Sequence, residues 1–156
     1  MEEKDVAVKV RFAGKEYQDG VTRLNAYAQQ LGVDKMVEFV GFLNRKELDS
    51  FLTDADMYVM PTMAEGLPRV IIEAMSKGLP CITTPVSGNP ELVSSHFLVD
   101  YYDTQTLAGR IEELTTNSQL YEQISKENYE RSLQYEASVL ERRRDGFYGK
   151  LLALVS

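Results

Sequence analysis

The sequence predicts an α/β fold, a Rossmann-like parallel sheet with helices on both faces, followed by a helical C-terminus. Short runs rich in β-branched residues alternate with segments of about ten residues whose apolar positions repeat at helical intervals. Such alternation is typical of right-handed βαβ units, in which ligands bind beyond the carboxyl ends of the strands. The 156 residues, 44% of them hydrophobic, are enough for one ordinary domain, which we expect to span residues 1–156.

The expected strands are apolar runs that end in Gly, Pro or Asp, residues that favour turns. They are Val6–Gly14, Met36–Gly41, Asp56–Pro61, Pro80–Pro85 and His96–Asp100. From Thr104 onward the chain is expected to be helical, with a break near Asn117 and Ser118.

Helix signals fill the segments between these strands. From Val21 to Gln30 the apolar positions repeat at helical spacing, and Gly32 ends the pattern. Asn44, followed by Glu47 three residues later, is typical of a capping box and predicts a helix from that point. A short helix is expected from Pro90.

The segment Pro68–Gly78 carries two conflicting signals. Its β-branched run Val70–Ile72 would suit a strand. Pro68, however, suits the first turn of a helix, and Gly78 suits its C-terminal stop. Lys77 would complement the helix dipole in the last turn. The length between Pro68 and Gly78 also favours the helix.

Composition and charge exclude several classes of protein. The formal net charge is −7, and no basic face of the kind that nucleic-acid binding needs is present. Cys81 is the only cysteine, which rules out an internal disulfide and suggests a reducing compartment. No apolar run approaches the roughly 20 residues of a membrane span. The acidic start "MEEKD" lacks the apolar core of a signal peptide, so we expect a cytoplasmic protein.

Two carboxylates, Glu65 and Glu73, stand in an apolar stretch with seven residues between them. In a helical projection Val70–Ile72, Ala74 and Met75 surround Glu73, and a helix that is apolar all round is expected to be buried. A buried carboxylate is costly unless something pairs with it. We therefore expect Glu73 to be buried and to need a partner or a ligand.

A helix that starts near Pro68 leaves Glu65 and Gly66 in a loop at the carboxyl edge of the sheet. Gly66 would let the backbone approach a ligand closely, and free amides at the helix N-terminus would bind an anion. Pro68 has no N–H to offer. The expected donors are Leu67, Arg69 and Val70. Amides flanked by two carboxylates suit a ligand with phosphate in the middle and hydroxyls at both ends, which is the layout of a nucleotide sugar.

In these residues the sequence resembles the retaining glycosyltransferases of family 4, which have the GT-B fold. Ala55–Val93 carries the resemblance, with the E-x7-E motif of Glu65 and Glu73, its continuation "EAMSKGLP" and the later "GNPE". The upstream run "LGVDKMVEFVGFLNRKEL" is similar to the family's approach to this motif. The segment "YERSLQYEASVLERRRDGFYGKLL" is similar to its closing helices, so the resemblance covers roughly residues 6–152.

The resemblance implies roles for the motif residues. Glu65 would be the catalytic carboxylate, in contact with the donor sugar's hydroxyls near the reacting carbon. Glu73 would hold the ribose. The amides around Leu67–Val70 would lie by the donor sugar and the diphosphate.

The same resemblance assigns residues outside the motif. Gly41 and Phe42 would lie near the base of the nucleotide. Gly88 and Glu91 complete the family pattern without a defined role. No cofactor and no metal is implied, because the helix dipole and basic residues would stabilise the leaving diphosphate.

The resemblance also implies that part of such an enzyme is absent. A GT-B enzyme has two domains with the active site between them, and this chain resembles only the second, donor-binding domain. The first strand–helix unit of that domain, with the basic residues that grip the donor phosphates, would precede Met1. We expect a nucleotide sugar and an N-terminal acceptor domain as partners, and any peripheral membrane contact would run through the absent domain.

In the doubly wound order 3-2-1-4-5-6 the absent strand is central. Val6–Gly14 and Asp56–Pro61 would flank the empty place, and unpaired inner edges are costly when buried and prone to association when exposed. We expect these two strands to pair directly, or the chain to form a dimer through the incomplete sheet. A strand inserted by another molecule, or an unstable chain, are the alternatives.

Other polar residues are interpreted as structural. His96 is the only histidine, and no nucleophile motif accompanies it. Cys81 lies in an apolar strand and is expected to be a core thiol. Arg142–Arg144 would form a solvated helical face. Tyr101 and Tyr102 follow an expected strand end; packing is the favoured role, and a place at the border of the pocket is the alternative.

Two functions of different classes remain. One is the donor-binding domain of a retaining glycosyltransferase that moves a sugar from a nucleotide sugar to an acceptor hydroxyl, in glycan or glycolipid synthesis. The other is a non-catalytic nucleotide-sugar-binding or assembly module. The intact motif favours the first for a full-length protein, and the absent acceptor domain favours the second for this polypeptide in isolation.

Overall fold

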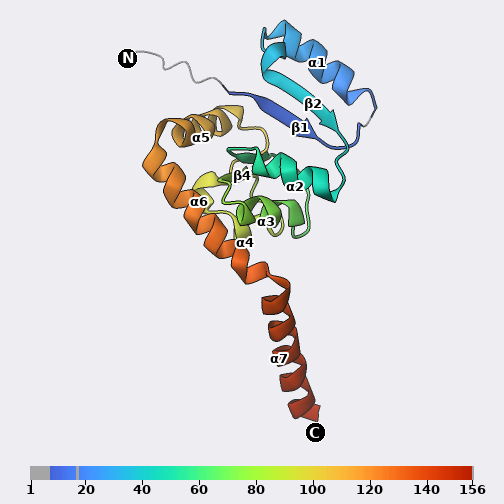
Figure 1. Cartoon of the computed structure of the whole chain (residues 1–156), viewed down its shortest axis with the longest axis vertical. Coiled ribbons are helices and arrows are strands. Elements are labelled where there is room, and N and C mark those ends of the chain that lie inside the picture. The colour runs from blue at the N-terminus through green and yellow to red at the C-terminus, as the bar shows by residue number, and fades with distance from the viewer. Residues whose placement is uncertain (1–7, 17, 156) are drawn as a thin grey trace. The chain divides into compact units, whose positions relative to one another are not determined.

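The computed structural model describes residues 8–16 and 18–155 of the chain (Figure 1). The residues fall into two compact units, Met1–Phe51 and Leu52–Ser156. The division falls inside helix α2 (Arg45–Thr53).

The first unit contains a parallel strand pair with a helix between its strands. Its elements are β1 (Val10–Ala13), α1 (Gly20–Gln30), the 3₁₀ helix η1 (Asp34–Met36) and β2 (Val37–Gly41). β1 runs parallel to β2, from Val10 opposite Val37 to Ala13 opposite Gly41, with an irregularity after Phe12. This is the βαβ unit that the sequence predicts. The start of the predicted strand, Val6 and Ala7, lies outside the described residues.

Packing in the first unit is thin. Ala28 is the only buried residue among those described there. The rings of Phe12 and Phe39 stack across the strand pair with their centroids 5.0 Å apart. Arg11 holds α2 against β1, because its guanidinium lies 4.5 Å from the ring centroid of Phe51 and donates a 3.3 Å hydrogen bond to the Phe51 carbonyl.

The second unit begins with another parallel strand pair. Its first elements are β3 (Tyr58–Met60), α3 (Arg69–Ser76), β4 (Cys81–Thr83) and α4 (Asn89–Leu92). β3 pairs with β4, from Tyr58 opposite Cys81 to Met60 opposite Thr83. α3 confirms the helical interpretation of the β-branched run, with Pro68 as its N-cap residue.

The prediction of a strand over His96–Asp100 was wrong. The structure has a 3₁₀ helix, η2 (Ser95–Phe97), followed by a single parallel bridge between Leu98 and Thr83. The amide of Val99 donates to the carbonyl of Thr83 at 2.7 Å, and the chain then turns at Asp100. This bridge gives the local backbone a hydrogen-bond partner, but the turns on either side prevent a longer β-ladder.

Helices form the remainder of the second unit. They are α5 (Thr104–Thr116), α6 (Ser118–Ser132), the 3₁₀ helix η3 (Leu133–Tyr135) and α7 (Ala137–Val155). The predicted break is confirmed at Asn117, whose side chain accepts the amide of Leu120 and so caps α6. No helix among the described residues is long and apolar enough to cross a membrane.

The core of the second unit lies between α3, β4 and α6. α3 packs along α6 and against β4. The largest fully buried apolar side chains come from several elements of the unit. They are Leu52, Ile71, Met75, Ile82, Leu92, Phe97 and Leu114.

The α/β fold class and the parallel strand direction are confirmed. Direct pairing of the two strands that should flank the absent one is not. β1 is paired with β2 and β3 with β4, in two separate two-stranded sheets. If the absent strand is number 1 in the order 3-2-1-4-5-6, then β1 and β2 are numbers 2 and 3, and β3 and β4 are numbers 4 and 5, so each observed pair joins neighbours in that order.

Candidate functional site

The motif loop, residues 61–68, joins the carboxyl end of β3 to the start of α3. Glu65, Gly66 and Leu67 are exposed, and Pro68 is buried. The helix begins at Arg69, and the amide of Ile71 donates to the carbonyl of Pro68 at 3.1 Å. Leu67 therefore lies just before the helix and Arg69 and Val70 in its first turn, and Glu65 lies in the loop that leads into it.

Threonine hydroxyls tie the start of this loop to β4. The hydroxyl of Thr84 donates to the carbonyl of Thr62 at 2.5 Å and accepts from its amide at 3.3 Å. The hydroxyl of Thr83 donates to the carbonyl of Met60 at 2.8 Å. Both threonines are buried, so these bonds are shielded from competing water.

Gly88 holds the other end of the loop. Its amide donates to the carbonyl of Gly66 at 3.2 Å. A Cβ at this position would lie 3.0 Å from the Gly66 oxygen and 3.0 Å from Leu67 Cδ1, so a side chain here would require the loop to shift by a few tenths of an ångström. The structure thus brings Gly88 to the motif loop, while Glu91 lies exposed in α4.

The expectation that Glu73 is buried was wrong. The buried face of α3 is formed by Ile71, Ala74 and Met75, and Glu73 lies about 200° around the helix from Ile71, on the exposed side. Ile72 is only partly buried. The carboxylate of Glu73 therefore stays in contact with solvent and needs no buried partner.

Glu73 lines an open hollow of about 360 Å³ between α3, α6 and η3. The other lining residues are Ile72, Ser76, Tyr129, Ser132, Leu133, Tyr135 and Glu136. Hydroxyls and a second carboxylate give this hollow hydrogen-bonding capacity.

Both motif carboxylates act on one phenol, Tyr58 at the start of β3. Burial raises the pKa of Tyr58 far above its usual value, and Cys81 and the negative charges of Glu65 and Glu73 add to that rise. The Tyr58 hydroxyl donates to the sulfur of Met60 at 3.4 Å. Glu65 and Glu73 are therefore both within electrostatic reach of the same hydroxyl group.

Gly41 and Phe42 belong to the first unit, whereas the Glu65–Glu73 motif belongs to the second. Gly41 ends β2 with φ of 74°, and its carbonyl accepts the amide of Gly14 at 2.8 Å. Phe42 is exposed, with Lys15 Nζ 5.2 Å from its ring centroid.

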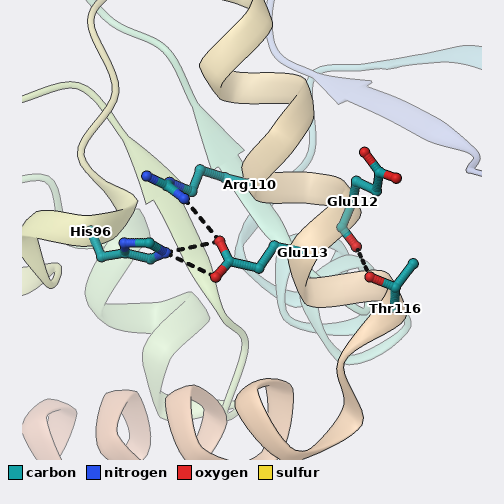
Figure 2. Close-up of polar contacts among 5 residues, drawn as sticks. All are labelled: His96, Arg110, Glu112, Glu113 and Thr116. Carbon is teal, nitrogen blue, oxygen red and sulfur yellow. Dashed lines mark hydrogen bonds and ion pairs between the residues drawn. The ribbon is translucent and has the colours of Figure 1, made fainter.

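His96 takes part in an ion-pair cluster outside the motif. Figure 2 shows the carboxylate of Glu113 between His96 and Arg110. His96 Nε2 lies 2.8 Å from Glu113 Oε2, and Arg110 Nη1 donates to the same oxygen at 3.0 Å. The hydrogen bond from His96 and then that from Arg110 lower the pKa of Glu113. The cluster joins η2 to α5, in agreement with a structural role for His96.

Sequence reasoning missed the residues that support the motif loop. Thr62, Thr83, Thr84 and Asn89 form a connected polar network behind it. The signal was present in the sequence, because "TT" ends a predicted strand and "GNP" opens the next helix, both at the carboxyl edge where ligands bind.

The family model for glycosyl transferases group 1 matches residues 1–131. The chain belongs to this family. Among the relatives of this group 1 chain is WcaL of Salmonella typhimurium, provisionally named a colanic acid biosynthesis glycosyltransferase. It is 35% identical over an alignment of 102 residues, and the match covers 60% of this chain and 25% of WcaL.

Solved structures share the fold of this group 1 chain. HepE from Anabaena, crystallised in complex with UDP, superposes with a TM-score of 0.83 at 24% identity, over 92% of this chain and 41% of HepE. The C-terminal domain of the group 1 protein LpcC from Francisella tularensis superposes with a TM-score of 0.70 at 26% identity. That match covers 76% of this chain and 64% of the LpcC domain. The chain thus spans well under half the length of WcaL and HepE.

Proposed function

We propose that this chain is the donor-binding part of a retaining glycosyltransferase, which transfers a sugar from a nucleotide sugar to an acceptor hydroxyl. One observation carries the proposal: the Glu65–Glu73 motif lies on a loop and helix whose start is fixed by Gly88 and the threonine network. A fixed helix N-terminus with a glutamate on either side suits a diphosphate bearing a hydroxylated group at each end.

Each motif residue has a role in this proposal. Glu65 contacts the hydroxyls of the donor sugar near the reacting carbon, and Glu73 holds the ribose. The exposure of both carboxylates supports these roles, because a donor can reach them from solvent. The amides of Leu67, Arg69 and Val70 face the sugar and the diphosphate.

The leaving diphosphate completes the proposed site. The helix dipole of α3 stabilises the leaving diphosphate, so transfer needs no metal ion.

The comparisons support the choice of donor and the division of labour. HepE, whose fold this chain shares, was crystallised with UDP, and a uridine nucleotide is therefore the first donor class to test. The chain also resembles the C-terminal domain of LpcC. We propose that the acceptor side belongs to an N-terminal domain of a longer cytoplasmic protein, and that the chain alone transfers no sugar.

Calorimetric titration of the 156-residue chain with UDP and UDP-glucose tests the donor site. We expect saturable binding that Glu65→Gln and Glu73→Gln each weaken by about tenfold, because each removes a charge-assisted hydrogen bond to a hydroxyl. Glu141→Gln in α7 is the matched control, since it removes an exposed carboxylate far along the chain from the motif.

Binding of neither uridine compound, nor of the corresponding adenosine, guanosine and cytidine sugars, would overturn the donor-site proposal. Binding that both motif variants leave unchanged would overturn the roles of Glu65 and Glu73. Robust sugar transfer by the purified chain would contradict the division of labour between two domains.

A further inference from the structure

We propose that Asn89 is a positioning residue that holds the motif loop in the conformation required for donor binding. Asn89 is the first residue of α4 and is fully buried, with 0% exposure. Its consequence for binding rests on the proposed function, but its action on the loop does not.

The side-chain amide of Asn89 reaches both threonines that support the loop. Its Nδ2 donates to Thr83 Oγ1 and to the carbonyl oxygen of Thr84, each at 2.9 Å. A single side-chain amide therefore donates both of its N–H groups, one to each of two adjacent residues at the end of β4.

Through the two threonines, these hydrogen bonds also hold the backbone that leads into the motif. Because Thr83 Oγ1 accepts from Asn89, its own hydrogen is free to point at the carbonyl of Met60, to which it donates at 2.8 Å. The Thr84 backbone is held by Asn89 while its hydroxyl bonds the carbonyl and the amide of Thr62. Asn89 thus orients the Thr83 hydroxyl directly and holds the backbone that carries the Thr84 hydroxyl.

Packing alone does not explain an asparagine at this position. The Oδ1 of Asn89 is buried and has no hydrogen-bond partner among the described residues. An unsatisfied buried acceptor is destabilising, and an apolar side chain of similar size would avoid that penalty. The two N–H groups are what an apolar replacement would lose, and both serve the loop.

The neighbouring Gly88 clamps the other end of the same loop. Its amide donates to the carbonyl of Gly66, one residue after Glu65, and Leu67 Cδ1 lies 3.0 Å from the place where a Cβ would be. No hydrogen bond or ion pair of the Glu65 side chain is recorded among the described residues. The position of its carboxylate therefore depends on the backbone, which the turn at Thr83–Asn89 fixes at Thr62 and at Gly66.

Hydrogen exchange in the ligand-free chain tests the action on the loop. We expect Asn89→Ala to raise the exchange rate of the Thr62 and Gly88 amides by about tenfold relative to the global rate. Asn128→Ala is the matched control, because Asn128 is 5% exposed and its Nδ2 donates to the Leu79 carbonyl at 2.9 Å, away from the loop. Equal exchange at Thr62 and Gly88 in the two variants would overturn the proposal.

Gly88→Ala is the second variant, which tests the clamp on the same loop if Asn89→Ala fails to fold. The added methyl group would press on Gly66 and Leu67, and we expect faster exchange in the same loop. Gly109→Ala is its control, because nothing lies within 4 Å of a Cβ at that position in α5. No local change in the Gly88 variant would overturn the clamp.

Titration separates this inference from the proposed function. We expect Asn89→Ala to weaken UDP-glucose binding by about tenfold and UDP binding by less, because the loop carries the carboxylate assigned to the sugar. Asn128→Ala should leave the ratio of the two affinities unchanged. If the parent chain binds neither compound, the donor-site proposal fails while the exchange experiment still decides the role of Asn89.

Discussion

Cys81 is kept as a neutral thiol by its surroundings. It is the first residue of β4 and is 1% exposed, and burial raises its pKa to about 12. At pH 8 only about one thiol in 10⁴ would be ionised, compared with about a quarter of ordinary cysteines. We predict that a disulfide reagent modifies native Cys81 at least about 10³-fold more slowly than it modifies free cysteine.

The control for this prediction is the same reaction in guanidinium chloride, where one thiol per chain should react at once. Fast modification of the native protein would mean that β4 opens to solvent far more often than its burial indicates.

Glu113 should give the protein a measurable acid sensitivity. Hydrogen bonds from His96 and Arg110 lower its pKa below the ordinary value of 4.5. A carboxyl whose pKa is lower in the folded state contributes stability above the unfolded value, and this contribution is lost as pH falls through the folded value. Because the side chain is about one-third exposed, we predict that Glu113→Gln costs at most about 1 kcal/mol at pH 7.

Urea denaturation across a pH series measures this effect. The difference between the parent and Glu113→Gln should shrink as pH falls below 4.5. Glu112→Gln is the control from the adjacent position, since its side chain points away from the cluster (Figure 2). A pH-independent difference would show that Glu113 acts through packing rather than charge.

Glu73 shows that the sequence predicted the location of single residues but not their burial. The spacing of Glu65 and Glu73 identified the loop and the helix that carry them, because that spacing is local. The exposure of Glu73 could not be predicted, because it depends on which face of α3 packs against α6. The same limit hid Asn89, whose importance comes from its contact with residues on another element.

At the scale of elements, the capping box of α2 is the strongest local signal. Asn44 Oδ1 accepts from the amides of Lys46 and Glu47 at 3.0 and 3.1 Å, and Glu47 Oε2 accepts from the Asn44 amide at 2.8 Å. This reciprocal pattern satisfies backbone donors that the first helical turn leaves free.

We predict that Asn44→Ala lowers the free energy of unfolding by about 1 kcal/mol, whereas Asn44→Asp, which keeps the acceptor, has a much smaller effect. Chemical denaturation followed by far-ultraviolet circular dichroism measures both variants. Equal loss in the two would mean that Asn44 contributes by something other than capping.

Helices were predicted better than strands, for a physical reason that the segment after η2 illustrates. Caps such as Asn44 and Asn117 act within one turn of the chain, so their signal is complete in the sequence. Leu98 forms a single bridge because the end of β4 happens to reach it and the flanking turns stop there. That outcome depends on a partner far along the chain, which periodicity does not encode.

At the scale of the whole molecule, each half of the described chain contains one pair of parallel strands. β1 is paired with β2, and β3 with β4, in the part of the chain that the structure describes. Alternation of strands and helices predicted the parallel pairs, because each pair is built from consecutive segments. It could not predict the division at Phe51, which follows from the sparse packing of the first unit.

Among the described residues β1 pairs with β2 alone, and its apolar side chains Val10 and Phe12 are 40% and 46% exposed. An apolar edge strand without a second neighbour offers free N–H and C=O groups to another chain. We predict that the 156-residue chain associates reversibly, so that its mass by light scattering rises with concentration. Val10→Lys should shift this association to about tenfold higher concentration, because a charge at a strand edge opposes pairing.

Thr22→Lys is the control, because it adds the same charge on the exposed surface of α1 and should leave the association unchanged. A mass that stays at one chain over the whole concentration range would show that the β1 edge does not recruit a partner, and an equal effect of both lysines would assign the association to net charge instead.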